Sequence, residues 1–311
     1  MIRIVTSFAV FTATLALALP ANAAGTLTRT FVSSSGVDTN PCTIAQPCAT
    51  FARAYTQTVS SGIIAALDPG KYGASTIGTP ITVNGNGWGA ITALASSDGI
   101  TVNANTTDTV TLIGLEIDGA LTGSNGILFN TGGTLIVTSC AIHNMMLDGI
   151  RFFPGASSTL RVSDTVTDNN VDAGIYLAQS GTGIVTATIE RVQASNNVNG
   201  IVLQGSTQPA AMLNAVIDES VAAANSNAGF GVVGPGGPAQ VLVFRSVAAN
   251  NQGVGLASQG NTATLWVGQS AVTGNANGWQ VISSGTLLSY GDNKIDGNAA
   301  NEMAPPSISN K

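Results

Sequence analysis

The chain repeats one pattern of polar and apolar positions: an asparagine, a short gap, a glycine, and then a run of apolar residues. Three such runs are GILFNT, GIYLAQ and GIVLQG, which begin at Gly126, Gly174 and Gly200. The runs are short and rich in β-branched residues, and Gly and Asn interrupt every stretch long enough for an amphipathic helix. The pattern therefore predicts short β-strands. The glycine recurs at positions 99, 126, 149, 174, 200, 229, 253 and 278.

The spacing of these glycines indicates a solenoid. Successive glycines are 23 to 29 residues apart, and a period of this size is typical of repeat architectures. The Leu-x-x-Leu-x-Leu framework of leucine-rich repeats is absent. We therefore predict an all-β fold, a single-stranded right-handed parallel β-helix (β-solenoid), in which each coil bonds to the coils above and below it at ~4.8 Å.

The asparagine that each coil carries at one turn predicts a stacked ladder. An amide both donates and accepts hydrogen bonds, so identical residues in successive coils can bond to one another. We expect the glycine to adopt a positive φ at the exit of this turn, and the apolar residue after it to point inward. The expected ladder is Asn144, Asn169 or Asn170, Asn196, Asn225, Asn250 and Asn275. The expected inward column is Ile127, Ile150, Ile175, Ile201, Phe230, Val254 and Trp279.

The two ends of the chain depart from the repeat. Residues 1–23 have the features of a secretory signal peptide: Arg3, an apolar stretch, and the small-x-small sequence Ala-Asn-Ala at 21–23. Residues 24–61 are predicted to form an N-terminal cap segment, with a disulfide loop and a short helix over Thr50–Val59 that covers the apolar end. The parallel β-helix spans residues 62–298, and residues 299–311 form a loose C-terminal tail.

The composition favours a packed, exported chain and argues against some partners. Charged residues are only 8% of the chain and apolar residues 44%, which is too apolar for a disordered polar tract. Without Arg3, nine basic residues stand against sixteen acidic ones, a net charge of −7. No Lys/Arg cluster occurs, so the electrostatic footprint of a nucleic-acid binder is missing. An acidic polysaccharide would also be repelled unless a cation bridged the two.

Two of the three cysteines lie close together, which predicts a disulfide. Cys42 and Cys48 belong to the loop NPCTIAQPCATF, and a disulfide is the default in an exported chain. A metal site is the alternative, but Asp38 is the one acidic residue or histidine near this loop. No segment after residue 23 has the length of a membrane span. We therefore expect a secreted protein, periplasmic or extracellular.

Most of the mature chain resembles a known family, and the N-terminal segment is the most specific part of that resemblance. FVSSSGVDTNPCTIAQPCATFARAY is followed by ALDPGKYG, and secreted, often bacterial pectin-lyase-like proteins with parallel β-helix repeats open with a similar segment. The matching parts are Val32–Asp38, the helix at Thr50–Val59, and Pro69–Tyr72. Relatives often carry other residues where this chain has Cys42 and Cys48, so the disulfide is not implied by the resemblance. The resemblance implies the fold.

The family includes lyases, hydrolases, epimerases, adhesins and many members with no assigned activity, so function has to be read from a site. The catalytic signatures of its enzymes are mostly missing here. Asn-Thr-Asp, Asp-Asp, Gly-His-Gly and Arg-Ile-Lys of the polygalacturonases do not occur, nor does Asp-Pro-His-Asp of the alginate epimerases. No full set of calcium-binding carboxylates with an arginine base, as in pectate lyases, is found.

One row of acidic residues emerges when the coils are aligned. Asp164, Glu190 and Glu219 fall at equivalent corner positions, with Ser139 before them and Arg245 and Gln269 after them. Three carboxylates stacked at ~4.8 Å would repel, which raises pKa values or recruits a cation such as Ca²⁺. The spacing also approaches that of a retaining glycosidase pair. The alternative is an exposed corner where water screens the charges and Glu219 pairs with Arg245.

The remaining candidates are single residues. His143, the one histidine, aligns with Asp168 of the next coil, and it should point away from Cys140, which disfavours a Cys–His nucleophile pair. Cys140 aligns with polar residues, Thr165, Arg191, Ser220 and Ser246. Trp266 shares a column with Arg161 and Leu242, which suggests a solvent-facing side chain able to stack on a sugar ring. Trp88 is expected in a loop.

These observations favour a secreted, non-catalytic β-helix that binds a glycan or a surface, or serves as a structural module. The partner would be an extracellular or cell-surface polysaccharide, with Trp266 as a carbohydrate-binding residue, no cofactor and no metal. The alternative is a polysaccharide lyase or glycoside hydrolase whose catalytic residues, or Ca²⁺ ligands, are Asp164, Glu190 and Glu219.

Overall fold

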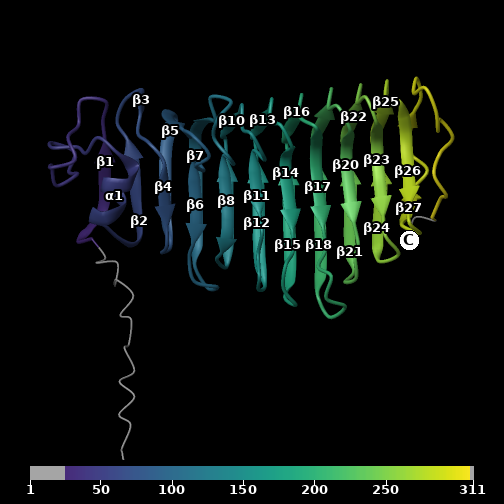
Figure 1. Cartoon of the computed structure of the whole chain (residues 1–311), viewed down its shortest axis with the longest axis horizontal. Coiled ribbons are helices and arrows are strands. Elements are labelled where there is room, and N and C mark those ends of the chain that lie inside the picture. The colour runs from purple at the N-terminus through teal and green to yellow at the C-terminus, as the bar shows by residue number, and fades with distance from the viewer. Residues whose placement is uncertain (1–24, 309–311) are drawn as a thin grey trace, which may run out of the picture.

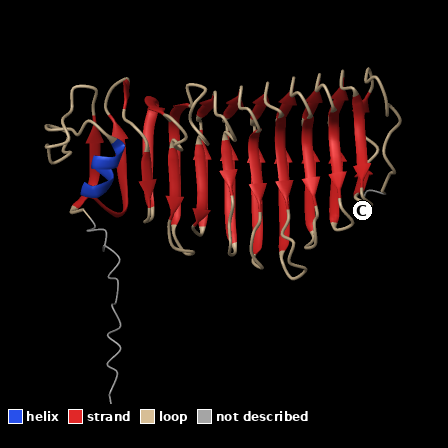
Figure 2. Ribbon diagram, viewed as in Figure 1, coloured by secondary structure: helices blue, strands red, loops and turns tan. Residues whose placement is uncertain are grey.

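The computed structural model describes residues 25–308, and the expected signal peptide at 1–23 lies outside them. The chain winds into a rod of stacked coils, and the coils follow one another in sequence order from one end to the other (Figure 1). Nearly all regular structure is strand, with one short helix at the N-terminal end (Figure 2). Strand pairs are parallel, as between β14 (Ala173–Ala178) and β17 (Asn199–Gln204). The predicted parallel β-helix is confirmed.

Two sheets run the length of the rod. The smaller has nine strands in the described part of the chain: β4 (Ser75–Ile77), β6 (Ile100–Asn103), β8 (Ile127–Thr131), β11 (Ile150–Phe152), β14, β17, β20 (Ala228–Val233), β23 (Val254–Gln259) and β26 (Asn277–Ile282).

The larger sheet has 19 strands among residues 25–308, and in each coil the chain turns a corner between two of its strands, so that the sheet forms two faces. At the N-terminal end it begins with β1 (Leu27–Val32), β2 (Thr58–Ala66), β3 (Gly70–Lys71), β5 (Ile81–Thr92) and β7 (Thr109–Asp118). The first face continues through β9 (Thr134–Thr138), β12 (Ser158–Ser163), β15 (Ile184–Glu190), β18 (Met212–Asp218), β21 (Ala239–Phe244), β24 (Ala263–Gly268) and β27 (Thr286–Ser289). The second continues through β10 (Ala141–His143), β13 (Val166–Asp168), β16 (Gln193–Ser195), β19 (Val221–Ala223), β22 (Val247–Ala249), β25 (Ala271–Thr273) and β28 (Lys294–Ile295).

The core is a set of stacked apolar columns, and one of them is the inward column expected from the sequence. Its members by strand register are Ile127, Ile150, Ile175, Ile201, Phe230, Leu256 and Trp279. Leu256 therefore replaces Val254, because the equivalent glycine of that coil is Gly255 and not Gly253. Trp279 is only partly buried, since it belongs to the last coil; its Nε1 donates to Met303 O at 2.7 Å.

The repeated glycine is required for a reason other than the expected positive φ. Gly200 and Gly229 do not have φ values in the left-handed region. A Cβ at Gly200 would instead lie 2.6 Å from Gly229 O, and one at Gly229 would lie 2.7 Å from Gly255 O. The coils approach each other too closely here for any side chain, so the glycine follows from the stacking.

The asparagine ladder exists, but its register differs by one residue in part of the rod. Its members are Asn170, Asn197, Asn225, Asn251, Asn275 and Asn298. Asn225 is typical: its backbone N–H and its Nδ2 both donate to Asn251 Oδ1, at 3.0 and 2.9 Å, and Nδ2 also donates to Ala194 O at 3.1 Å. All six side chains are buried. The ladder thus binds successive coils together inside the turn.

The expected ladder residues Asn144, Asn196 and Asn250 lie one position earlier, so that part of the prediction was wrong. Their φ values are 61°, 58° and 56°, and the residue after each belongs to the ladder column, as the bond from Met145 N to Asn170 Oδ1 shows. Asparagine is the non-glycine residue best suited to the left-handed conformation. In the pairs Asn196-Asn197 and Asn250-Asn251, the first asparagine therefore adopts the left-handed φ, and the second forms the ladder bonds.

The N-terminal end is covered by α1 (Phe51–Gln57), as predicted from the amphipathic pattern. Thr50 caps the helix by accepting from Arg53 N, and Phe51 and Ala54 are buried against the first coils. The helix is shorter than the expected Thr50–Val59 because Thr58 already begins β2, where its hydroxyl contacts that of Thr30 at 2.7 Å.

The predicted disulfide is present in the N-terminal loop, and the Pro-Gly-x-Tyr segment forms a polar anchor beside it. Cys42 and Cys48 are bonded, with their Cα atoms 4.7 Å apart. The buried Tyr72 donates its hydroxyl to the Asp68 carboxylate at 2.6 Å. Hydrogen bonds from Ser33 and then Tyr72 lower the pKa of Asp68 to about 2, so the anchor remains charged at neutral pH.

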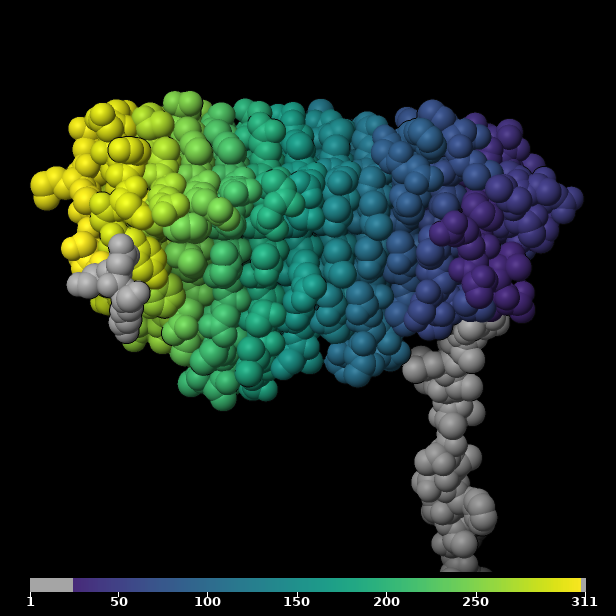
Figure 3. All heavy atoms as spheres, turned by 180° about the vertical axis from the view of Figure 1, so that it is seen from behind, coloured from purple at the N-terminus to yellow at the C-terminus, as the bar shows by residue number. Residues whose placement is uncertain are grey.

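The C-terminal tail is not loose as far as residue 308. Ser289 N donates to Pro306 O and Ile308 N donates to Ser289 O, both at 2.9 Å. The tail therefore pairs with the free edge of β27, whose backbone groups would otherwise face water. Seen from behind, the coils form adjoining bands in sequence order (Figure 3), so each coil contacts mainly its neighbours.

Candidate functional site

The first face of the larger sheet presents outward rows of side chains that run along the rod. One row contains Ile136, Arg161, Thr188, Val216, Leu242 and Trp266 by strand register. This confirms the expected column of Trp266 with Arg161 and Leu242. Within β24, Leu265 and Val267 are fully buried, whereas Trp266 between them points outward and is half-buried.

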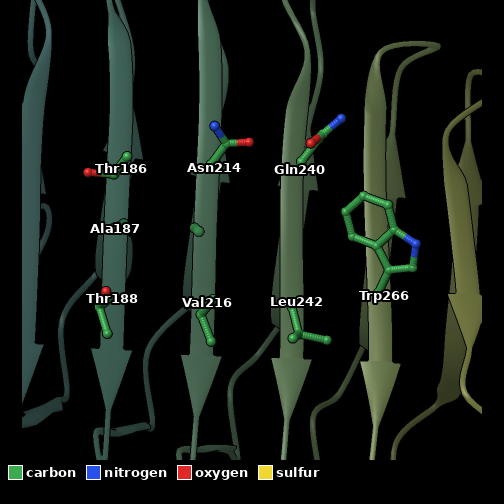
Figure 4. Close-up of a pocket in the computed structure, with 9 residues that line it drawn as sticks. Thr186, Ala187, Thr188, Asn214, Val216, Gln240, Leu242 and Trp266 are labelled. Carbon is green, nitrogen blue, oxygen red and sulfur yellow. The ribbon is translucent and has the colours of Figure 1, made fainter. Parts of the chain in front are cut away.

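Trp266 stands at one end of a shallow, open hollow of about 350 Å³. The row formed by Thr186, Asn214 and Gln240 lies beside the row of Thr188, Val216 and Leu242 (Figure 4). The residues lining the hollow are Thr186, Ala187, Thr188, Asn214, Ala215, Val216, Gln240, Leu242 and Trp266. The hollow is therefore walled by an indole, aliphatic side chains, hydroxyls and two amides.

The chemistry of this hollow suits an uncharged polar ligand with an apolar side. Asn214 and Gln240 face each other across β18 and β21, and their amides can each donate and accept hydrogen bonds. Trp266 offers an aromatic surface with a polar N–H. The lining carries no ionisable side chain, so no group in it would be desolvated as an unpaired charge.

A second hollow continues the first toward the N-terminal end. It has a volume of about 360 Å³ and shares Thr188 with the first. Its lining includes Ile136, Arg161, Ser163 and Glu190. The open face therefore extends beyond Trp266 along the axis of the rod.

The acidic row expected at the neighbouring corner is interrupted by an arginine. The corner residues with positive φ are Ser139, Asp164, Arg191, Glu219, Arg245 and Gln269. Glu190 is not among them: it ends β15 and pairs in register with Ser163 and Asp218. The sequence alignment was wrong by one residue at this coil, because β15 extends to Glu190 and leaves Arg191 to make the turn.

Ion pairs partly neutralise this corner, where Arg191 and Arg245 contact Asp164, Glu190, Asp218 and Glu219. Arg191 Nε lies 2.6 Å from Asp164 Oδ1, and the same guanidinium contacts Glu190. Arg245 Nη1 lies 3.4 Å from Glu219 Oε1, as the alternative interpretation predicted, and Arg245 also contacts Asp218. The hydrogen bond from Arg191 lowers the pKa of Asp164.

Asp164, Glu190 and Glu219 are gathered around the guanidinium of Arg191, whose Nη1 also lies 4.0 Å from Glu219 Oε2. A lowered pKa at Asp164 is the opposite of what a general acid needs. Among residues 25–308, no group of three or more His, Cys, Asp and Glu side chains is placed to hold a metal ion. The positive-φ corner residues Asp164, Arg191, Glu219 and Arg245 alternate in charge, and the carboxylates of Glu190 and Asp218 lie beside them.

His143 and Cys140 both line a further hollow of about 330 Å³, together with Glu116 and Asp164, but their environments differ. His143 pairs in register with Asp118 and Asp168, and its Nε2 lies 3.9 Å from Glu116 Oε1. Cys140 is buried, and burial raises the pKa of its thiol to about 11, so the thiol stays protonated at neutral pH. In the polar column of Cys140, Val192 takes the place expected for Arg191, with Val192 N donating to Ser220 Oγ.

Comparison with known proteins assigns the fold family. Residues 98–276 match the family described as the right handed beta helix region. The chain belongs to this family. Among solved structures, this right-handed β-helix is similar to the A-module of the mannuronan C-5 epimerase AlgE4 from Azotobacter vinelandii, with 14% identity, a TM-score of 0.47, and 91% of this chain and 89% of that chain covered.

Another solved structure that this β-helix resembles is the pectate lyase Pel9A, with 16% identity, a TM-score of 0.46, and 88% of this chain and 72% of that chain covered. No curated protein sequence matches the chain. Among the described residues, no helix is long and apolar enough to cross a membrane.

Sequence reasoning found Trp266 but missed the amides beside it. Asn214 and Gln240 each lie two residues before a member of the Trp266 row, Val216 and Leu242. Side chains two residues apart on a strand share a face. Extending the alignment by two positions in each coil would have found them.

Proposed function

We propose that this β-helix protein binds a neutral polysaccharide through the open face at Trp266, without cleaving it. The observation that carries the proposal is the hollow itself, in which Trp266 stands beside Asn214 and Gln240 with no charged group in the lining. Pyranose rings have apolar C–H faces and a rim of hydroxyls. The indole would stack on such a face, and the amides and threonines would bond to the hydroxyls.

The proposal also accounts for the charge of the chain. The net charge of −6 gives no general attraction for acidic polymers. A neutral glycan is not affected by this charge, so its affinity should depend little on ionic strength. The rigid sheet holds Trp266 in place before binding, which lowers the entropy cost of recognition.

The test is a binding panel with soluble polysaccharides. Affinity electrophoresis and isothermal titration calorimetry with neutral glucans, xylans and mannans should identify at least one ligand. Trp266→Ala should then weaken binding by about tenfold, which corresponds to ~1.4 kcal/mol. Trp88→Ala is the matched control, since Trp88 in β5 is 43% exposed and far from the hollow along the chain.

The panel can contradict the proposal in two ways. Equal losses in Trp88→Ala and Trp266→Ala would point to nonspecific tryptophan contacts. Binding confined to uronic-acid polymers, with a strong salt dependence, would mean that a charged surface and not the neutral hollow recognises the glycan.

The absence of cleavage is tested on the same polysaccharides. We expect no release of reducing ends and no absorbance of unsaturated products, because the carboxylates Asp164, Glu190 and Glu219 are held in ion pairs with arginines. Sugar release that disappears in the double variant Asp164→Asn, Glu190→Gln would restore the lyase or hydrolase alternative.

We further propose that the protein works outside the cytoplasm and without a metal cofactor. The disulfide between Cys42 and Cys48 supports the first point, because disulfides persist in oxidising compartments. Fractionation of cells that express the full chain would test it: retention in the cytoplasm would contradict export.

A further inference from the structure

A separate part of the molecule carries exposed apolar side chains in consecutive coils. They lie at the tight turns that lead from the second face of the larger sheet to the nine-stranded sheet. Their exposed fractions are Leu94 61%, Leu121 64%, Met146 46%, Leu147 43% and Val171 50%. We call these five residues the apolar ridge.

Backbone hydrogen bonds place the members of the apolar ridge in adjoining turns. Leu121 N donates to Asn144 O at 3.0 Å. Met146 N donates to Gly123 O at 2.8 Å, and Val171 N donates to Met145 O at 2.9 Å. The members of the ridge therefore lie in successive turns and are not scattered single residues, which would be ordinary on a protein surface.

The fold does not require apolar residues at these positions. Val171 follows the ladder residue Asn170, and the equivalent positions in the later coils are Val198, Ser226, Gln252, Ala276 and Ala299, of which Ser226 and Gln252 are polar and exposed. Ser226 N donates to Asn197 O at 2.9 Å and Gln252 N donates to Asn225 O at 2.8 Å, which repeats the backbone bond of Val171. The same turn is thus built with an exposed polar side chain in two of the later coils.

Carboxylates border the apolar ridge on both sides. Asp118 and Asp168 lie at the ends of β7 and β13, immediately before the turns. Asp172 follows Val171 and is exposed. Two cations lie near these carboxylates: Lys71 is close enough to Asp118 to help lower its pKa, and Arg151, on the other side of the turns, is bonded to Asp148 at 2.9 Å. The surface around the ridge is therefore negative.

We propose that the apolar ridge docks an amphipathic segment of another protein, whose apolar residues are flanked by Lys or Arg. An apolar strip supplies the buried centre of such an interface, and the bordering carboxylates select the partner by charge. A second copy of this chain would bring Asp118, Asp168 and Asp172 against like charges. An anionic membrane surface would be repelled by the same groups. The proposal is independent of the Trp266 face and its ligand.

The test uses three synthetic peptides as probes. The first is an amphipathic Leu/Lys peptide, the second a Leu/Glu peptide with the same apolar pattern, and the third a Ser/Lys peptide with the same charge. Fluorescence anisotropy should show that the full mature chain binds the Leu/Lys peptide at least tenfold more tightly than either of the others. Comparable binding of the Leu/Glu peptide would overturn the charge assignment, and comparable binding of the Ser/Lys peptide would overturn the role of the ridge.

Variants then locate the contact. The double variant Leu121→Ser, Met146→Ser should weaken binding of the Leu/Lys peptide at least tenfold. The control Ile184→Ser, Met212→Ser removes two exposed apolar residues at a different corner and should leave binding unchanged. Asp168→Asn, Asp172→Asn should weaken binding and reduce its dependence on salt. Equal losses in the ridge and control variants would contradict the proposal, and circular dichroism confirms that each variant is folded.

Two further measurements address the other occupants. Sedimentation of the wild-type chain should show a monomer at all concentrations, and a dimer that is lost in Leu121→Ser, Met146→Ser would assign the ridge to self-association instead. Co-sedimentation with phosphatidylglycerol vesicles should be negative. Vesicle binding that the ridge variant abolishes would assign it to a membrane surface.

Discussion

The two tight corners of each coil have similar backbones and opposite chemistry. At one, Asp164, Arg191 and Glu219 adopt positive φ and keep their charged side chains in solvent. At the other, Asn196 adopts positive φ and Asn197 turns its amide inward, where it joins the buried ladder. The same change of chain direction is thus made once with screened charges and once with desolvated amides.

This difference distinguishes the buried amides, which contribute strongly to stability, from the exposed charges, which contribute little. A buried amide gives up its hydrogen bonds to water when the chain folds. If its partner in the protein is then removed, nothing replaces those bonds, and the fold is destabilised. An exposed ion pair contributes little, because water and salt screen it. The three predictions below compare the corners, beginning with the largest effect.

The largest effect is expected at the centre of the buried ladder. Asn225→Ala removes the acceptor for Asn197 N and the donor to Ala194 O. It should lower the free energy of unfolding by about 4 kcal/mol, because several buried groups lose a partner at once. Thermal melts followed by circular dichroism measure the loss.

Asn196→Ala is the matched control for this ladder variant. Asn196 is exposed, and its contribution comes from its left-handed φ. Alanine in the same conformation should lower the free energy of unfolding by about 1 kcal/mol. A greater loss in Asn196→Ala than in Asn225→Ala would contradict the register of the ladder.

The next effect concerns a carboxylate buried beside the ladder corner. Asp148 has a side chain with no exposed surface, and burial raises its pKa from 3.8 to about 6, against the hydrogen bond from Ala173 N and the charge of Arg151. The folded state therefore holds this proton more tightly than the unfolded chain does. The contribution of Asp148 to the stability of the fold should be greatest below pH 3.8 and fall as the pH rises to 6, by about 3 kcal/mol.

Asp148→Asn isolates this contribution. The stability of the variant relative to the wild type should increase as the pH is raised from 3.5 to 7.5 across that window. Asp164→Asn at the exposed corner should show the opposite sign: its pKa is lowered by Arg191, so the carboxylate helps above its unfolded pKa and loses that effect as the pH falls. A flat profile for Asp148→Asn would contradict the burial of a charged group there.

The smallest effect is expected from the exposed corner at neutral pH. Neither Arg191→Gln nor added calcium should shift the melting temperature measurably at physiological salt, since the ion pairs are screened. The measurement is differential scanning fluorimetry at low and high salt. A calcium-dependent rise in melting temperature that Asp164→Asn, Glu190→Gln removes would show that the carboxylates bind a cation after all.

The sequence was sufficient for the architecture but not for the register within each coil. The glycine period predicted the β-helix because close stacking imposes glycine at one position in every coil. The register of the ladder could not be read in the Asn-Asn pairs, because one asparagine is selected for its φ and the next for its amide. Gly253 and Gly255 both fit the repeated glycine position by their spacing. The strand pairing shows that Gly255 occupies it.

The candidate site was predicted only in part for the same reason. Trp266 and Leu242 lie in coils of regular length, so their shared column could be recognised from spacing. Glu190 and Arg191 differ by one position, and which of them turns the corner depends on where β15 ends. Sequence spacing does not fix that end. The burial of Asp148 could not be predicted from the sequence either, because the groups that bury it come from different coils.

The ladder also has a consequence for how the molecule forms. Its side-chain bonds join residues that are only 23 to 28 positions apart in sequence. The rod therefore contains no ladder contact that must wait for two distant chain segments to meet. Once two neighbouring coils have formed, each further coil adds to an existing template, as in other linear repeat proteins. The time needed to fold should thus be governed by the first pair of coils and not by the length of the chain.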